Sequence, residues 1–323
     1  NIDYNRLEQG IAHYFTDQYA LDAAGEAALL MQKYGVNRQV LGRDEILKIE
    51  PALKSFASHI VGGTYTESDE SGDARVFTQA LARRCGERGA QLLWGHDIEQ
   101  IEQRGDEITG VRVRNRIDGQ LRMLTGDAFV VACGSYTTPL LRAIGIPVPI
   151  YPGKGYSATL PLLRPQDAPS VSMIDDQLKI AISRLGDQLR VAGTIELGGF
   201  DLSLDTPLAR RRCEMLVRRI ETVFPGVADT RTPQEGGNPH FWTGLRPATP
   251  TNIPLIGQLP RRKLWINAGH GTLGWTHGAG SGKALAELIS GEQPAMDFGF
   301  TGQPARVRTA VATGGLKAAS VQR

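Results

Sequence analysis

Apolar and polar residues recur along the chain with two periods, one typical of helices and one typical of strands. The first fifty residues are predicted to be helical, because 20–34 is rich in Ala, Leu and Glu and 44–50 follows as a shorter helix. After Asp73, which can cap a helix, apolar residues keep a 3.6-residue period as far as Gly86. Further helices are predicted over 137–145, 207–223 and 276–290.

Strand-like segments fill most of the intervals between these helices. A group of short segments separated by glycines indicates an inserted set of antiparallel strands. Phe129–Cys133 is continuously apolar and stops at Gly134, as a buried parallel strand does. The predicted strands are 91–94, 98–102, 107–114, 121–124, 129–133, 155–160, 178–183, 188–196 and 264–267.

This order of elements predicts an α/β fold, a doubly wound sheet with an inserted meander. The composition changes at 146–149, which read Ile-Pro-Val-Pro, and strands predominate from there to Arg246. We therefore expect a second domain of the α+β kind with a mixed or antiparallel sheet. Residues 301–323 show no periodicity, so a mobile tail is expected there.

Composition and charge narrow the classes of function. Among 323 residues, 36 Lys and Arg face 34 Asp and Glu, and a net charge of +2 is too small for a dedicated nucleic-acid binder. No run approaches the ~20 apolar residues that span a bilayer. The three cysteines lack the spacing of a disulfide framework or a zinc site and fit a reducing compartment.

Glycine is over-represented, and the densest group lies over 269–282. Gly269-His270-Gly271-Thr272-Leu273-Gly274 matches G-x-G-x-x-G between a strand and a helix. A primary dinucleotide fingerprint also needs a second strand and an acidic residue ~20 positions on, and neither follows here. The loop remains a candidate for presenting backbone N–H groups to an anionic or carbonyl ligand, and a helix entry without a ligand is the alternative.

Arg246 is the other candidate for chemistry, because it lies between bulky apolar residues and a turn stiffened by proline. An arginine in this setting is either paired within the fold or presented to a carboxylate, and the residues alone favour the structural ion pair. His240, His270 and His277 lack metal-ligand spacing, so no metal site is expected. The basic run at 210–212 and 218–219 favours a solvated helix face over contact with anionic lipid.

Several segments together resemble the D-amino acid oxidase-like superfamily of flavoenzymes, and within it the catalytic subunit of the bacterial D-amino acid dehydrogenases. The resemblance covers most of the chain, and its last three segments are specific as a set. The segments are Asp-Glu-Ser-Gly-Asp-Ala at 69–74, Gly-Ala at 89–90 with Trp-Gly-His at 94–96, Val-Val-Ala-Cys-Gly-Ser-Tyr at 130–136, 241–250, and 269–276. Where the family shows Thr-Pro-Asp-Gly after its arginine, this chain has Thr-Pro-Thr-Asn at 249–252, which is expected to alter only a turn.

The resemblance implies a glutathione-reductase-like FAD-binding domain beside a substrate domain. It assigns 1–30, 73–146 and 248–298 to the FAD-binding domain, 31–72 and 147–247 to the substrate domain, and 299–323 to the tail. The family's first strand, its own G-x-G-x-x-G and the acidic residue after it belong upstream of Asn1. We therefore expect this chain to lack the N-terminal βαβ segment and its flavin binding to be impaired.

The resemblance also implies roles for individual residues. Arg246 would bind the substrate carboxylate, and Tyr151 and Tyr156 are candidates for active-site tyrosines. Ile98 would contact the adenosine part of FAD, and loop amides near Gly271 and Thr272 would stabilise charge at the flavin N1/O2 edge. The full set of expected cofactor contacts is Ile98, Ala132, Cys133, Gly134, Gly269, His270, Gly271, Thr272, Leu273, Gly274, Trp275 and Thr276.

The implied activity is FAD-dependent oxidation of D-amino acids such as D-alanine to 2-oxo acids and ammonia. Hydride would pass to the flavin, and the electrons would go on to a quinone or another respiratory acceptor. The implied location is the cytoplasm, with peripheral contact at the inner face of the plasma membrane. Two alternatives stay open: a sister amine oxidoreductase for D-hydroxyproline, sarcosine or glycine, and a truncated, non-catalytic partner subunit.

Overall fold

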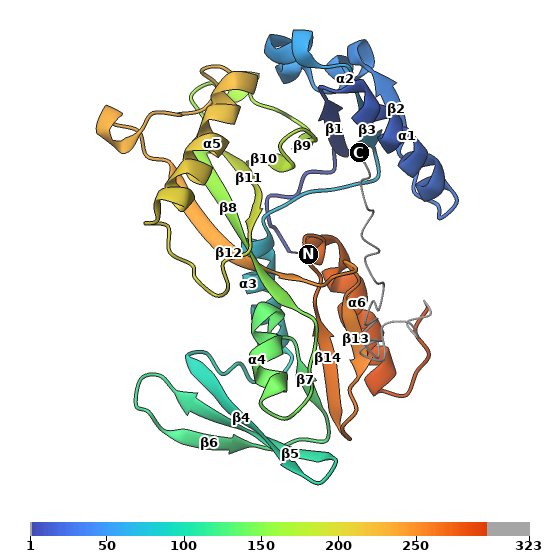
Figure 1. Cartoon of the computed structure of the whole chain (residues 1–323), viewed down its shortest axis with the longest axis vertical. Helices are drawn as coiled ribbons and strands as arrows, with labels where there is room; N and C mark the ends of the chain where they lie inside the picture. Colours follow the sequence, from blue (N-terminus) through green and yellow to red (C-terminus); the bar gives the residue numbers. More distant parts are fainter. Residues whose placement is uncertain (1, 296–323) are drawn as a thin grey trace, which may run out of the picture. The chain divides into compact units, whose positions relative to one another are not determined.

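The computed structural model describes residues 2–295, which divide into two compact units (Figure 1). The first unit holds the chain up to Trp94 together with Pro152–Arg246. The second holds Gly95–Tyr151 and the described chain from Pro247 onward. The predicted tail at 299–323 lies outside the described residues. The assignment of segments to an FAD-binding and a substrate domain stays a prediction.

The first unit is built on an eight-stranded mixed sheet, as expected for an α+β domain. β1 pairs in parallel with β9. Five further pairings are antiparallel: β1–β3, β2–β3, β9–β10, β10–β11 and β8–β11. The order across the sheet is β12 (His240–Ala248), β8 (Tyr151–Pro161), β11 (Gln188–Glu196), β10 (Ile180–Leu185), β9 (Ser172–Asp175), β1 (Ile11–Phe15), β3 (Gly62–Thr66) and β2 (Gln39–Gly42).

The predicted helix α5 (Pro207–Val223) packs its apolar face into the core of this unit. Thr206 caps it by accepting a hydrogen bond from the Ala209 amide at 3.1 Å, and Pro207 occupies the first turn, where its missing N–H is not needed. The other helices of the unit are α1 (Gln18–Gln32), α2 (Arg43–Ile49), α3 (Ala74–Glu87) and the 3₁₀ segments η1 (Pro51–His59), η3 (Pro165–Asp167) and η4 (Pro233–Glu235).

The expectation that the first fifty residues are helical is wrong at two strands, β1 and β2. β1 is only five residues long, and its partners β3 and β9 lie far along the chain, so no local pattern marks it. β3 begins with two glycines because a Cβ at Gly62 would lie 2.6 Å from the Leu41 carbonyl oxygen. The predicted strand over 91–94 is a loop, and β3, β9, β12 and β13 (Leu255–Gln258) were not predicted.

The second unit contains the expected three-stranded meander and a small sheet of three strands. In the small sheet β7 and β14 run parallel, and β13 is antiparallel to β14. The strands are β4 (His96–Arg104), β5 (Glu107–Asn115), β6 (Leu121–Leu124), β7 (Phe129–Val131), β13 and β14 (Leu264–Ala268). The helices are η2 (Gly134–Tyr136), α4 (Thr137–Arg142) and α6 (Gly274–Ile289).

A buried carboxylate connects β1, β9 and α5 within the first unit. Asp175 is fully buried and accepts hydrogen bonds from the Tyr14 hydroxyl at 2.7 Å and from Arg219 Nε at 2.5 Å. The Arg219 guanidinium also lies 4.8 Å from the centre of the Phe56 ring. Burial raises the pKa of Tyr14 above its usual value, so its hydroxyl remains a donor to Asp175.

His13 on β1 should make the stability of the fold sensitive to acid. Burial, and then the nearby Arg38, lower the pKa of His13 to about 4, against about 6.5 in the unfolded chain. Between these pH values the unfolded chain binds a proton that the folded chain does not, so acid favours unfolding there. Lowering the pH from 7 to 4.5 should cost about 2–3 kcal/mol through this group.

The measurement is urea unfolding of the native protein and of His13→Gln at both pH values. The variant should lose about 2 kcal/mol less on acidification than the native protein, although carboxylates titrate in both. An equal loss in the two proteins would show that His13 is not held neutral by the fold.

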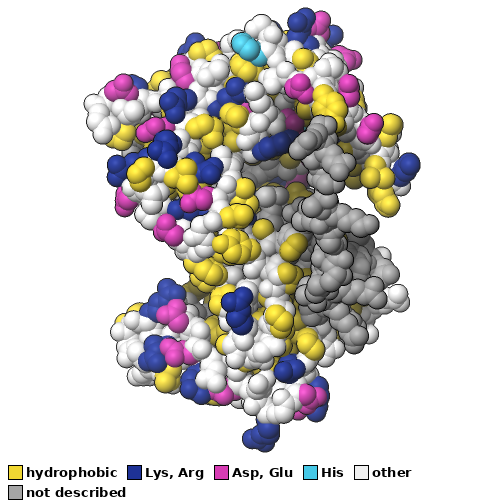
Figure 2. Space-filling view, in the orientation of Figure 1, with side chains coloured by type: hydrophobic (Ala, Val, Ile, Leu, Met, Phe, Trp, Pro, Cys, Tyr) yellow, Lys and Arg dark blue, Asp and Glu magenta, His cyan; other side chains and the backbone are white. Residues whose placement is uncertain are grey.

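Charged side chains of both signs are interspersed over the visible face of each unit (Figure 2). None of the helices within residues 2–295 is long and apolar enough to cross a membrane.

Candidate active site and cofactor loop

The guanidinium of Arg246 lies against Gly155 on the neighbouring strand β8. A Cβ atom at Gly155 would lie 2.9 Å from Arg246 Nε, closer than real Cβ contacts come, and 3.3 Å from Cζ, which is also tight. The Thr243 hydroxyl donates to the Gly155 carbonyl at 2.9 Å and ties β12 to β8 at the same place. Gly155 therefore leaves room for the guanidinium, a reason for glycine within a strand that the sequence analysis missed.

Arg246 has no acidic partner among the described residues, so the structural ion pair that the residues alone favoured is not formed there. Burial lowers the pKa of the Arg246 guanidinium, and no neighbouring charge acts against that effect. An arginine nevertheless stays charged in proteins, so the fold holds a partly desolvated cation without its counter-ion. Its planar fork is suited to a bidentate carboxylate.

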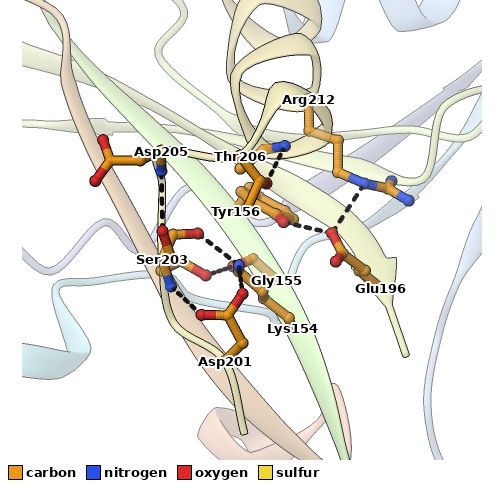
Figure 3. Close-up of polar contacts among 11 residues, drawn as sticks. Lys154, Gly155, Tyr156, Glu196, Asp201, Ser203, Asp205, Thr206 and Arg212 are labelled. Atoms are coloured by element: carbon orange, nitrogen blue, oxygen red, sulfur yellow. Dashed lines mark hydrogen bonds and ion pairs between the residues drawn. The ribbon is translucent and has the colours of Figure 1, made fainter. Parts of the chain in front are cut away.

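Tyr156 lies on the face of β8 opposite to Arg246, because successive side chains of a strand point to opposite faces. Its ring is buried, and its hydroxyl donates to Glu196 Oε2 at 2.5 Å (Figure 3). Burial, and then Glu196, raise the pKa of Tyr156 above its usual value. Tyr151 begins β8, is half exposed and belongs to the second unit. The structure thus places Gly155, and not Tyr156, beside the guanidinium.

In the second unit, two of the predicted cofactor segments follow the carboxyl ends of neighbouring parallel strands. Residues 132–134 follow β7, and 269–273 follow β14. Gly134, Gly269 and Gly271 have φ values of 53°, 84° and 56°, which glycine adopts readily. Because ligands of α/β sheets bind beyond the carboxyl ends of parallel strands, these two segments are the expected place for a nucleotide.

The loop after β14 offers hydrogen-bond donors to a ligand. α6 begins at Gly274 without a side-chain cap, and the first-turn amides of a helix have no carbonyl partner inside it. A Cβ at Gly271 would meet no atom within 4 Å, so the backbone there is open to close approach. Two polar atoms of this region, Asn267 Oδ1 and His277 Nδ1, are buried without a partner. The amides and His277 Nδ1 can donate to the carbonyl and phosphate oxygens of FAD, whereas Asn267 Oδ1 can accept from one of its hydroxyl or N–H groups.

Two residues of the loop are already occupied by bonds within the unit. The Gly271 amide donates to the Pro247 carbonyl at 2.9 Å, which leaves the amides of Thr272 and Gly274 for a ligand. His270 Nε2 lies 3.0 Å from the Ser281 hydroxyl and so fastens the loop to α6. Burial, and then His277, lower the pKa of His270, which keeps the ring neutral near pH 7.

A family model described as FAD dependent oxidoreductase (DAO) matches residues 1–288. The chain belongs to this family. Its members are FAD-dependent enzymes, which confirms the resemblance, the cofactor and the class of reaction expected from the sequence.

Curated relatives of this FAD-dependent oxidoreductase include two bacterial proteins named D-amino acid dehydrogenase. The protein of Dechloromonas aromatica is 48% identical over 93% of this chain and 69% of its own length. The protein of Methylobacterium nodulans is 42% identical over 91% of this chain and 66% of its own length. The chain thus spans about two thirds of the length of these relatives.

Solved structures of the same fold include glycine oxidase from Geobacillus kaustophilus and L-proline dehydrogenase from P. horikoshii. Each has a TM-score of 0.78, with 23% and 19% identity. They cover 93% and 94% of this chain, and the matches span 76% and 77% of the solved chains. These similarities support the expected fold with its mixed and antiparallel sheets.

For this FAD-dependent oxidoreductase all of the predicted cofactor contacts, within the loop and outside it, stay predictions. Ile98 lies on β4, pairs with Val113 and is nearly half exposed. Ala132 is exposed, and burial raises the pKa of the half-buried Cys133 thiol, which keeps it protonated. Asn267 and His277 were not predicted to serve a ligand, because nothing in the sequence shows that their polar atoms are buried without partners.

Proposed function

We propose that this FAD-dependent oxidoreductase catalyses the oxidative deamination of D-amino acids, D-alanine among them, to 2-oxo acids and ammonia. The names of the relatives support this substrate class. The single observation that carries the proposal is the Arg246 guanidinium, which is partly desolvated, lies against Gly155 and has no acidic partner within residues 2–295. A substrate carboxylate supplies the missing counter-ion.

In the proposed reaction Arg246 binds the carboxylate through two parallel hydrogen bonds and so fixes the orientation of the substrate Cα. The absence of a side chain at Gly155 leaves the space that the guanidinium occupies in that position. FAD, when bound, would supply the hydride acceptor for this oxidation, and water would hydrolyse the imino acid product to the 2-oxo acid and ammonia. The amides of Thr272 and Gly274 would hold the cofactor. No protein base is required when the substrate amine binds in its neutral form.

The proposal extends to the electron acceptor and the location. Electrons pass to a quinone or another respiratory acceptor, and the enzyme works in the cytoplasm in peripheral contact with the inner face of the plasma membrane. The exposed Arg210, Arg211 and Arg218 on α5 support that contact, because basic side chains are attracted to anionic lipid head groups.

The test is the visible spectrum of the flavin-loaded protein under anaerobic conditions, before and after addition of an amino acid. D-Alanine should bleach the oxidised flavin band, and L-alanine should leave it unchanged, because with the carboxylate anchored and the side chain placed on one side, only one enantiomer points its Cα–H at the flavin. Bleaching by glycine or sarcosine but not by D-alanine would assign the sister activity instead. A loaded flavin that none of these amines reduces would contradict the proposal.

A further inference from the structure

Two glycines on one face of β8 make room for side chains from the strands on either side. The Gly155 position is filled by the Arg246 guanidinium from β12. The Gly153 position is filled by Ile195 from β11, whose Cδ1 would lie 2.5 Å from a Cβ atom there. Positions two apart on a strand share a face and lie about 7 Å from one another. The apolar side chain of Ile195 and the guanidinium of Arg246 therefore fill neighbouring positions on one face of β8.

Ile195 reaches this position because β11 bulges opposite Gly155. The register pairs Gly193 with Tyr156 and Glu196 with Lys154, so Thr194 and Ile195 together face a single residue of β8. Thr194 has a φ of 57°, which is rare for a β-branched residue, and its hydroxyl is buried without a partner. Strain of this kind is concentrated at functional sites, where the surrounding structure holds it in place.

Buried polar contacts on the opposite face of β8 hold the end of β11 that follows the bulge (Figure 3). Lys154 is 1% exposed, and its Nζ donates to the Ser203 carbonyl at 2.6 Å in the loop after β11. The Tyr156 hydroxyl donates to Glu196, the residue that follows Ile195, and Arg212 lies 3.6 Å from the same carboxylate. The side chains that flank Gly155 thus fasten the end of β11, and with it Ile195.

We propose that Ile195 contacts the side chain of the amino acid whose carboxylate Arg246 binds, and so determines which side chains the enzyme accepts. This inference rests on the proposed function. The carboxylate and the side chain leave the same Cα, so anchoring one at Arg246 fixes where the other extends. Ile195 is 47% exposed and therefore accessible, and its branched surface favours short apolar side chains over bulky ones.

The test compares kcat/KM of the flavin-loaded protein for D-alanine, D-valine and D-phenylalanine. Ile195→Ala should raise the D-phenylalanine to D-alanine ratio at least tenfold, since removing part of a pocket wall changes discrimination by about that factor. Gly153→Ala, which displaces Ile195 from β8, should shift the same ratio without changing Ile195 itself. Leu197→Ala is the matched control, because Leu197 is 70% exposed and two residues away, and its ratio should match the native one.

Unchanged ratios in both Ile195→Ala and Gly153→Ala would overturn the inference. An equal fall for all three substrates would also overturn it, because a general loss of activity is not a change of preference. If none of the D-amino acids reduces the flavin of the native protein, the proposed function fails, and not this inference alone. The visible spectrum of the native protein, recorded before any variant is made, separates the two failures.

Discussion

Replacing Arg246 by Met should lower kcat/KM for D-alanine by roughly 10- to 150-fold, mainly through a higher KM, because a charge-assisted pair worth ~1.5–3 kcal/mol is lost. Met retains much of the apolar stem of arginine, and Arg246 makes no ion pair among the described residues that the change would break. The flavin absorption of the loaded protein should therefore stay the same. Steady-state kinetics with an artificial electron acceptor, recorded beside the visible spectrum, measure both quantities.

Gly155→Ala provides a second variant that keeps the charge. The added methyl group would displace the guanidinium, whose Nε would otherwise lie 2.9 Å away, so KM should rise while the arginine remains. Gly155 has no positive φ, and the displaced atoms are the end of a flexible side chain, so the fold should tolerate the change. Native kinetics in Arg246→Met would remove this arginine from the substrate site.

Asp175→Ala should destabilise the protein by about 3–5 kcal/mol, the usual cost of removing one partner from a buried ion pair. The change leaves Arg219 and the Tyr14 hydroxyl without the acceptor that joins β1, β9 and α5. Urea unfolding followed by circular dichroism measures the loss. Asp97→Ala is the control, because its partner Arg116 is exposed and such pairs contribute at most about 1 kcal/mol. Equal midpoints for the two variants would show that the buried carboxylate contributes nothing unusual.

The sequence indicated those features of the site that depend on neighbouring residues alone. The glycines of 269–274 and the setting of Arg246 were predicted because a turn or a presented arginine has a local signature. The ion pair favoured for Arg246 does not form with any residue that the structure describes, because the fold decides which acidic groups approach a side chain.

Features that depend on strand register could not be predicted. Gly155 matters because Arg246, 91 positions along the chain, lies against it, and the bulge at Thr194 and Ile195 exists only in relation to β8. The face to which Tyr156 points follows from the same register. β1 escaped detection for a similar reason, because both of its neighbours in the sheet come later in the sequence.

The position of β1 also bears on how the protein is made. β1 can pair with β3 once residue 66 has been synthesised, but its other edge waits for β9, and Ile11 pairs with Ser172. At 5–20 residues per second the ribosome takes roughly 10–30 s to synthesise the chain between Ile11 and Ser172. Throughout that time the nascent chain presents an unpaired strand edge, the kind of surface on which chaperones act and misfolded chains associate.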